Sequence, residues 1–128
     1  MNREELNKLS KIVLDSSIEV HKNLGPGLLE STYEVYLCKE LKLKNLKYLR
    51  QVSLPVYYKN ELLDMEYKID VIVENELIIE LKSVEILLPV HFAQLLTYLK
   101  LSDKRLGLLI NFNVPRLVDG VKRVVNNF

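Results

Sequence analysis

The stretch from Ile69 to Lys82 most constrains how this chain can fold. It holds two short apolar runs separated by a polar turn at residues 74–76, which is the pattern of two β-strands joined as a hairpin. Such a hairpin returns Asp70, on the first strand, to the neighbourhood of Glu80 and Lys82 on the second. Because side chains alternate across a strand, Glu80 and Lys82 share one face, and the residue between them lies on the other. We therefore expect two carboxylates and an ammonium at one end of an apolar hairpin.

These three side chains suit the metal-dependent hydrolysis of a phosphodiester bond. Carboxylates are the ligands that hard divalent cations prefer. A neighbouring ammonium orients the attacking water and offsets the negative charge that develops during the reaction. The alternative interpretation is that Asp70, Glu80 and Lys82 form a solvated strand edge, since charged residues often end strands.

Length and composition narrow the class of protein. The 128 residues are 48% hydrophobic and 27% charged, which predicts one domain over residues 1–128 with a packed core. The formal net charge of +1 argues against a protein that coats nucleic acid without specificity, but not against an enzyme. The lone Cys38 excludes an intramolecular disulfide and a cysteine zinc site. Without an apolar leader or a membrane-length apolar run, we expect a cytoplasmic protein with no membrane partner.

Helix and strand patterns alternate along the chain without a linker. Helices are predicted where apolar residues recur at helical spacing or a proline opens the segment, over about 4–21, 28–43, 89–100 and 115–125. Strands are predicted over β-rich or continuous apolar runs, at about 52–58, 65–73, 77–83 and 105–112. Pro55 cannot donate to a neighbouring strand, so the first of these is an edge or bulged strand. The expected fold is an α/β mixed sheet flanked by helices, in the order α-α-β-β-β-α-β-α.

An Asp followed ten residues later by Glu-x-Lys resembles the core motif of the PD-(D/E)XK, or restriction-endonuclease-like, nuclease superfamily. The βββαβ order preceded by a helix is similar to the core of that superfamily. No proline precedes Asp70, but that motif proline varies widely. Five blocks further resemble one bacterial and archaeal member family, the GxxExxY family, and together cover about residues 10–126: Gly27–Tyr33, Gln51–Tyr58, Glu80–Val84, His91–Leu99 and Gly107–Phe112.

The resemblance implies a nuclease that uses Mg²⁺ or Mn²⁺ to cleave DNA or RNA. It implies Glu30, Asp70 and Glu80 as metal ligands, with Lys82 positioning the attacking water and Gln94 supporting it. Glu30 opens the second predicted helix, where the helix dipole alone favours a carboxylate. A purely structural role for Glu30 therefore stays open at this point.

Other polar residues have both a functional and a structural interpretation. Glu34 shares a helix face with Glu30 and is the substitute metal ligand if Glu30 is not one. Tyr33 is expected to be a buried structural tyrosine. His91, Gln94 and Tyr98 share one face of the helix after the Glu-x-Lys strand, where His91 is expected either to cap or buttress the site or to be a satisfied structural residue.

The expected partners follow from charge and size. Two basic groups are present, which are either solvated faces or contacts to a nucleic-acid backbone: Lys39, Lys42, Lys44, Lys47 and Arg50, and Lys100, Lys104, Arg105, Lys122 and Arg123. No base-reading motif, Walker phosphate loop or nucleophile elbow is present. The alternative function is a catalytically silent nuclease fold that binds nucleic acid or a protein partner. A homodimer would suit so small a chain.

Overall fold

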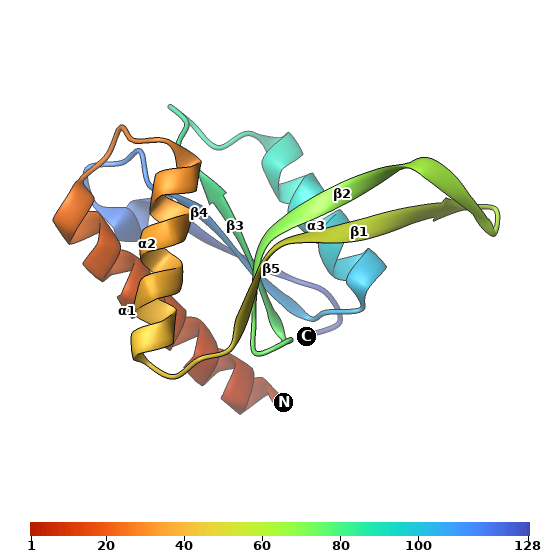
Figure 1. Ribbon diagram of the computed structural model, residues 1–128, viewed down its shortest axis with the longest axis horizontal. Coiled ribbons are helices and arrows are strands. Elements are labelled where there is room, and N and C mark those ends of the chain that lie inside the picture. The colour runs from red at the N-terminus through yellow and green to blue at the C-terminus, as the bar shows by residue number, and fades with distance from the viewer.

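Five strands form one mixed sheet that is flanked by three helices. The computed structural model describes all residues, 1–128. The elements follow the chain in this order: α1 (Arg3–Leu24), α2 (Glu30–Leu43), β1 (Tyr48–Tyr58), β2 (Glu61–Val73), β3 (Leu77–Lys82), α3 (Pro89–Ser102), β4 (Leu106–Asn111), a 3₁₀ turn (Leu117–Gly120) and β5 (Val121–Val125). The strands lie in sequence order across the sheet (Figure 1). Only β3 and β4 run parallel, because α3 connects them as a crossover.

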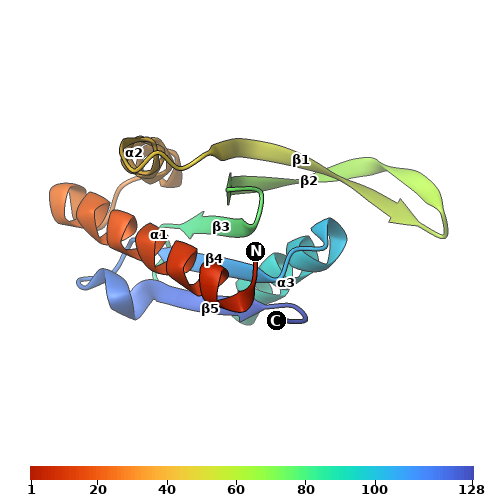
Figure 2. The same ribbon diagram turned by 90° about the horizontal axis from the view of Figure 1, so that it is seen from below.

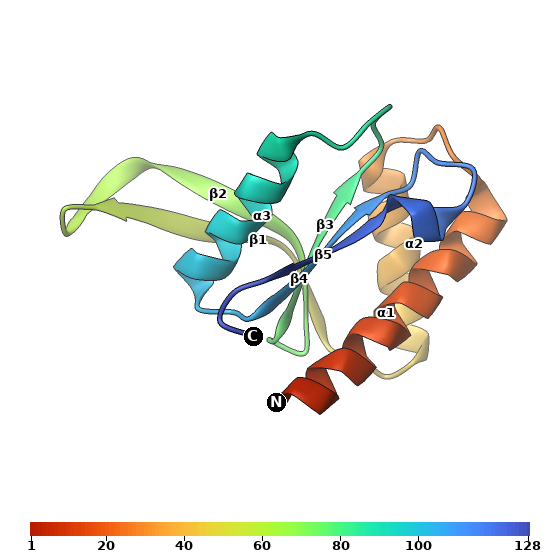
Figure 3. The same ribbon diagram turned by 180° about the vertical axis from the view of Figure 1, so that it is seen from behind.

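The two faces of the sheet are covered unequally. Helices α1 and α2 cover one face, and α3 alone covers the other (Figures 2 and 3). Eighteen buried residues make the cluster under α1 and α2, which we call the major core. Seven make the cluster under α3, which we call the minor core: Ile69, Ile72, Ile78, Leu95, Tyr98, Leu99 and Leu109. Strand β3 contributes to both, with Ile79 in the major core and Ile78 in the minor core.

The loop between α1 and α2 is held by the predicted structural tyrosine. Helix α1 ends at Gly25, whose φ of 70° is unfavourable for residues with a side chain. The Tyr33 hydroxyl donates to the Gly25 carbonyl at 2.6 Å and accepts from the Leu28 N–H at 3.1 Å. The Tyr33 ring is fully buried and stacks on Phe112, with ring centroids 4.3 Å apart. The prediction of a buried structural tyrosine is confirmed.

The β1–β2 hairpin extends beyond the body of the molecule as an arm (Figure 1). Strand β1 is an edge strand, and its pairing with β2 shifts between Pro55 and Tyr57. This agrees with the edge or bulged strand expected from the proline. The outer part of the arm carries five exposed large apolar side chains: Tyr57, Tyr58, Leu62, Leu63 and Met65.

The predicted fold class is confirmed, but the helix expected over 115–125 is wrong. That segment forms the 3₁₀ turn and then β5, which pairs antiparallel with β4. Gly120 permits the change of direction, because a Cβ there would lie 2.2 Å from the Asn111 carbonyl oxygen. The β-branched Val121, Val124 and Val125 then favour a strand, which also covers the edge that β4 would otherwise expose. No helix combines the length and apolar character needed to cross a membrane.

Candidate active site

Asp70 and Glu80 face each other where the β2–β3 hairpin stops pairing. The register pairs Val71 with Ile79, so the next position places Asp70 opposite Glu80. At that position hydrogen bonds between backbone and side chain replace the backbone pairs of the hairpin. The Asp70 N–H donates to Glu80 Oε1 at 3.0 Å, and the Leu81 N–H donates to Asp70 Oδ2 at 2.9 Å. These reciprocal bonds hold the two carboxylates beside one another.

The Glu80 carboxylate is buried without a cation in contact with it. Glu80 is only 4% exposed. Burial, followed by the negative charge of Asp70, raises the pKa of Glu80 to about 9. Lys82 lowers that pKa, but its effect is the smallest, and it forms no ion pair with either carboxylate. No cationic side chain of the site is therefore in contact with Glu80 to balance a charge on it.

Tyr98 brings α3 to the same site. Burial raises the pKa of its phenol to about 12, and the charges of Glu80 and Asp70 are the next causes. The Tyr98 ring also packs against Tyr67 of β2, with centroids 5.3 Å apart. The phenol thus lies in the electrostatic field of both carboxylates.

A second group of polar residues links Asp70 to α2. Glu34 is 4% exposed. Its Oε2 accepts from Arg50 Nε at 3.0 Å and Nη2 at 2.8 Å, and its Oε1 accepts from Gln51 Nε2 at 2.7 Å. The same Gln51 nitrogen lies 3.3 Å from Asp70 Oδ1. Gln51 therefore joins the carboxylate of the helix to that of the sheet.

The backbone changes its pattern at Gln51 and Asp70. Gln51 has a φ of 50°, in the left-handed region. Ile69 and Ile72 both belong to the minor core although they are three residues apart, which simple strand alternation forbids. Side chains thus exchange faces at this point on β2, so the site lies at a break in the regular sheet.

No side-chain hydrogen bond or ion pair joins the other predicted site residues to this group. Glu30 is the exposed first residue of α2, and its side chain makes no hydrogen bond or ion pair. Gln94 lines a pocket of about 250 Å³ with Tyr67, Val90, Ala93 and Thr97, and no hydrogen bond joins it to either carboxylate. His91 Nδ1 accepts from the Leu88 N–H at 2.9 Å at the N-terminus of α3, which favours the structural role over support of the site. No group of three or more Asp, Glu, His or Cys side chains is close enough to share a metal ion.

Sequence reasoning missed Arg50 and Gln51 as parts of the site. Arg50 was assigned only to a basic group, and Gln51 appeared only within a block of family resemblance. Both were missed because strand alternation would place two consecutive residues on opposite faces of the sheet. The available signal for a shared role was that Arg50 and Gln51 are adjacent polar residues directly before a β-rich run.

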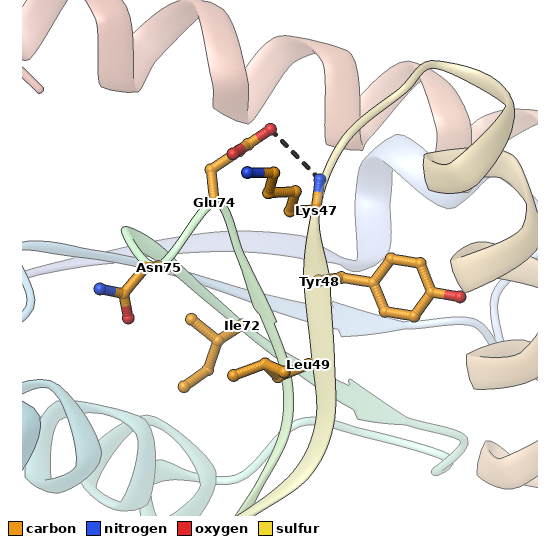
Figure 4. A pocket seen from close by; sticks show the side chains of 6 residues that line it. All are labelled: Lys47, Tyr48, Leu49, Ile72, Glu74 and Asn75. Carbon is orange, nitrogen blue, oxygen red and sulfur yellow. Dashed lines mark hydrogen bonds between the residues drawn. The ribbon is translucent and has the colours of Figure 1, made fainter.

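The largest pocket lies elsewhere. It measures about 420 Å³ and is lined by residues around the start of β1 and the β2–β3 turn (Figure 4): Lys47, Tyr48, Leu49, Ile72, Glu74 and Asn75. Glu74 is tied down there, since its carboxylate accepts from the Lys47 N–H at 3.2 Å. The turn lies at the other end of the three paired positions of the hairpin from Asp70 and Glu80, and neither carboxylate lines this pocket, so it is not part of the carboxylate site.

A mixed sheet with helices on both faces and an Asp–Glu-x-Lys group at the end of its central hairpin defines a restriction-endonuclease-like protein. The chain belongs to the PD-(D/E)XK nuclease superfamily, because the family model of that description matches residues 7–124. No curated protein and no solved structure matches the chain. Nucleases of this superfamily generally use divalent metal ions.

The residues at the site fit a divalent cation. Asp70 and Glu80 offer oxygen ligands on adjacent strands, and a third carboxylate, Glu34, is joined to Asp70 through Gln51. Hard cations such as Mg²⁺ and Mn²⁺ prefer such oxygen ligands. A cation would also offset the burial and mutual repulsion that keep Glu80 protonated at neutral pH.

Proposed function

We propose that this chain is a divalent-metal-dependent nuclease that hydrolyses phosphodiester bonds of DNA or RNA. The observation that carries the proposal is the placement of Asp70 directly opposite Glu80, with Lys82 two residues further along the same strand. Membership of a nuclease superfamily supports it. The resemblance to the GxxExxY family, and a cytoplasmic location, belong to the same proposal.

Asp70 and Glu80 are the proposed ligands of Mg²⁺ or Mn²⁺. When bound, such an ion supplies a Lewis acid for the phosphate and a water of lowered pKa. Each carboxylate accepts a hydrogen bond from the backbone of the facing strand, and the two side chains held in this way would hold the ion. Lys82, on the same face as Glu80, is proposed to hold the attacking water and to offset the charge of the phosphate.

The third ligand is a choice between two acids of α2. Sequence reasoning favoured Glu30 and named Glu34 as its substitute. Glu34 is buried and reaches Asp70 through Gln51, whereas Glu30 is exposed and makes no such contact. Neither acid forms a group of three with Asp70 and Glu80 that could share an ion, so the third ligand stays a prediction, as does the supporting role of Gln94 for the attacking water.

A second candidate function is a nuclease fold that binds nucleic acid or a protein partner without cleaving. The arm supports it, because its exposed Tyr57, Tyr58 and Leu62 are side chains that partner surfaces commonly use. A homodimer would be one form of this proposal. The buried Glu80 favours the enzyme, since a binding surface has no physical need for paired acids.

The test is cleavage of fluorescent single- and double-stranded DNA and RNA with Mg²⁺, Mn²⁺ or EDTA. Asp70→Asn, Glu80→Gln and Lys82→Met are each expected to lower the rate by about a hundredfold or more, a loss typical of a group that stabilises the transition state. Glu4→Gln, an exposed change in the first turn of α1, is the matched control and should cleave normally. Metal-independent cleavage, or cleavage that all three site variants retain, would contradict the proposal.

A further inference from the structure

Two consecutive residues of β1 reach the same buried carboxylate. Arg50 binds Glu34 Oε2 and Gln51 binds Glu34 Oε1. In a regular strand the two side chains would point to opposite faces of the sheet. The left-handed conformation of Gln51, with a φ of 50°, is what allows both to reach one acid.

That conformation has a cost for glutamine. The left-handed region disfavours residues with a Cβ by about 1–2 kcal/mol, and glycine or asparagine adopts it most readily. A site that required only the backbone shape would be served better by glycine. The contacts of the Gln51 side chain, to Glu34 at 2.7 Å and to Asp70 at 3.3 Å, are the interactions available to offset this cost.

We propose that Gln51 is a positioning residue that uses one amide nitrogen to hold the Asp70 carboxylate in place against Glu34, which Arg50 anchors in turn. This inference rests on the proposed function, because Asp70 is one of the two proposed ligands of the divalent cation. Arg50 satisfies the other oxygen of Glu34, which leaves Oε1 for Gln51. Strained backbone at a functional site is a known means of fixing such an arrangement.

Three variants separate this role from a purely structural one. Gln51→Gly removes the amide and relieves the strained φ, whereas Gln51→Met removes the amide and keeps both the strain and the bulk. Lys59→Gly is the matched control, since Lys59 has the same φ of 50° but lies in the turn at the tip of the arm. Titration calorimetry with Mg²⁺ and with Mn²⁺ gives the affinity, and urea unfolding of the metal-free protein gives the stability.

We expect both Gln51 variants to bind the ions about 10–100-fold more weakly, as is usual when a residue that orients a metal ligand is lost. Lys59→Gly should bind them as wild type does. Gln51→Gly should be at least as stable as Gln51→Met, so that affinity falls without a matching loss of stability.

The outcomes distinguish the two proposals. If wild type binds neither ion at millimolar concentration, the proposed function is contradicted, and this inference with it. If wild type binds and the Gln51 variants bind equally tightly, only the positioning role is wrong. A loss of metal affinity only in variants that urea unfolding also shows to be destabilised would assign Gln51 a structural role and overturn the inference.

Discussion

The two faces of the sheet differ in both size and chemistry. The face under α1 and α2 holds the larger apolar cluster, and its one buried carboxylate, Glu34 of α2, is paired with Arg50. The face under α3 holds seven buried residues, and along β3 its apolar run passes from Ile78 directly to Glu80. The difference teaches that apolar burial is divided unequally between the faces. The unpaired buried acid, Glu80, follows the thinner apolar layer, whereas the buried acid beside the thicker one has an arginine partner.

The largest expected effects come from two neighbouring isoleucines of β3. Ile79 and Ile78 are both fully buried, the first in the major core and the second in the minor core. Truncating either to alanine should cost about 2–5 kcal/mol of unfolding free energy, with Ile79→Ala at the upper end because its cavity lies among more buried neighbours. Urea unfolding measures both free energies, and a larger loss of stability for Ile78→Ala would contradict the idea that the major core contributes more to stability than the minor core.

Glu80 predicts how stability depends on pH. Its pKa is raised from 4.5 to about 9 in the folded metal-free protein. The folded state thus keeps a proton that the unfolded state releases, so the stabilisation is complete below pH 4.5 and is lost as the pH rises toward 9. The slope approaches about 1.4 kcal/mol per pH unit in that window. Glu80→Gln should flatten it in a series of urea titrations with EDTA, whereas an unchanged slope would show that Glu80 is not its source.

Loss of Glu34 and loss of Arg50, the two partners of the ion pair between α2 and β1, should lower the unfolding free energy by different amounts. The Glu34 side chain is 5% exposed, but that of Arg50 is 42% exposed. Arg50→Met leaves a buried carboxylate with Gln51 as its remaining partner, which should cost about 1–3 kcal/mol. Glu34→Gln removes the charge and returns Arg50 to water, so it should cost less than about 1 kcal/mol. Equal losses in thermal unfolding would contradict this asymmetry.

The smallest effect is expected at the tip of the arm. Tyr57 is 60% exposed and belongs to neither core. Tyr57→Ser should therefore change the unfolding free energy by no more than about 0.5 kcal/mol. The same variant in an analytical ultracentrifuge tests the partner-binding alternative. A stability loss above 1 kcal/mol would mean that the arm is part of the folded core.

Local patterns predicted much of this fold, since helix α1, the β2–β3 hairpin, the edge strand with Pro55 and the crossover helix were all expected from the sequence. The C-terminal strand was missed because Pro115 suggested a helix start, whereas the decisive requirement was non-local. Strand β4 needs a neighbour, and Gly120 must pass close to the Asn111 carbonyl. No pattern within the segment itself reports either condition.

The site was predictable only where it obeys strand geometry. The register of the hairpin places Asp70 opposite Glu80, one step beyond its last backbone pair, and counting residues was enough to expect it. The link through Arg50 and Gln51 breaks alternation, because a glutamine at positive φ turns two adjacent side chains toward one acid. Single-residue backbone exceptions of this kind leave no periodic signal.

The only cysteine provides a built-in reporter of motion. Cys38 lies buried on α2, and burial raises its pKa to about 11, although Arg50 opposes the shift. Its thiolate is therefore scarce and shielded in the closed protein. Alkylation by a colourless reagent should proceed only when α2 lifts from the sheet. The labelling rate would then report how often α2, the helix that carries Glu34, separates from the sheet. Because the chain has no second cysteine, the signal comes from Cys38 alone.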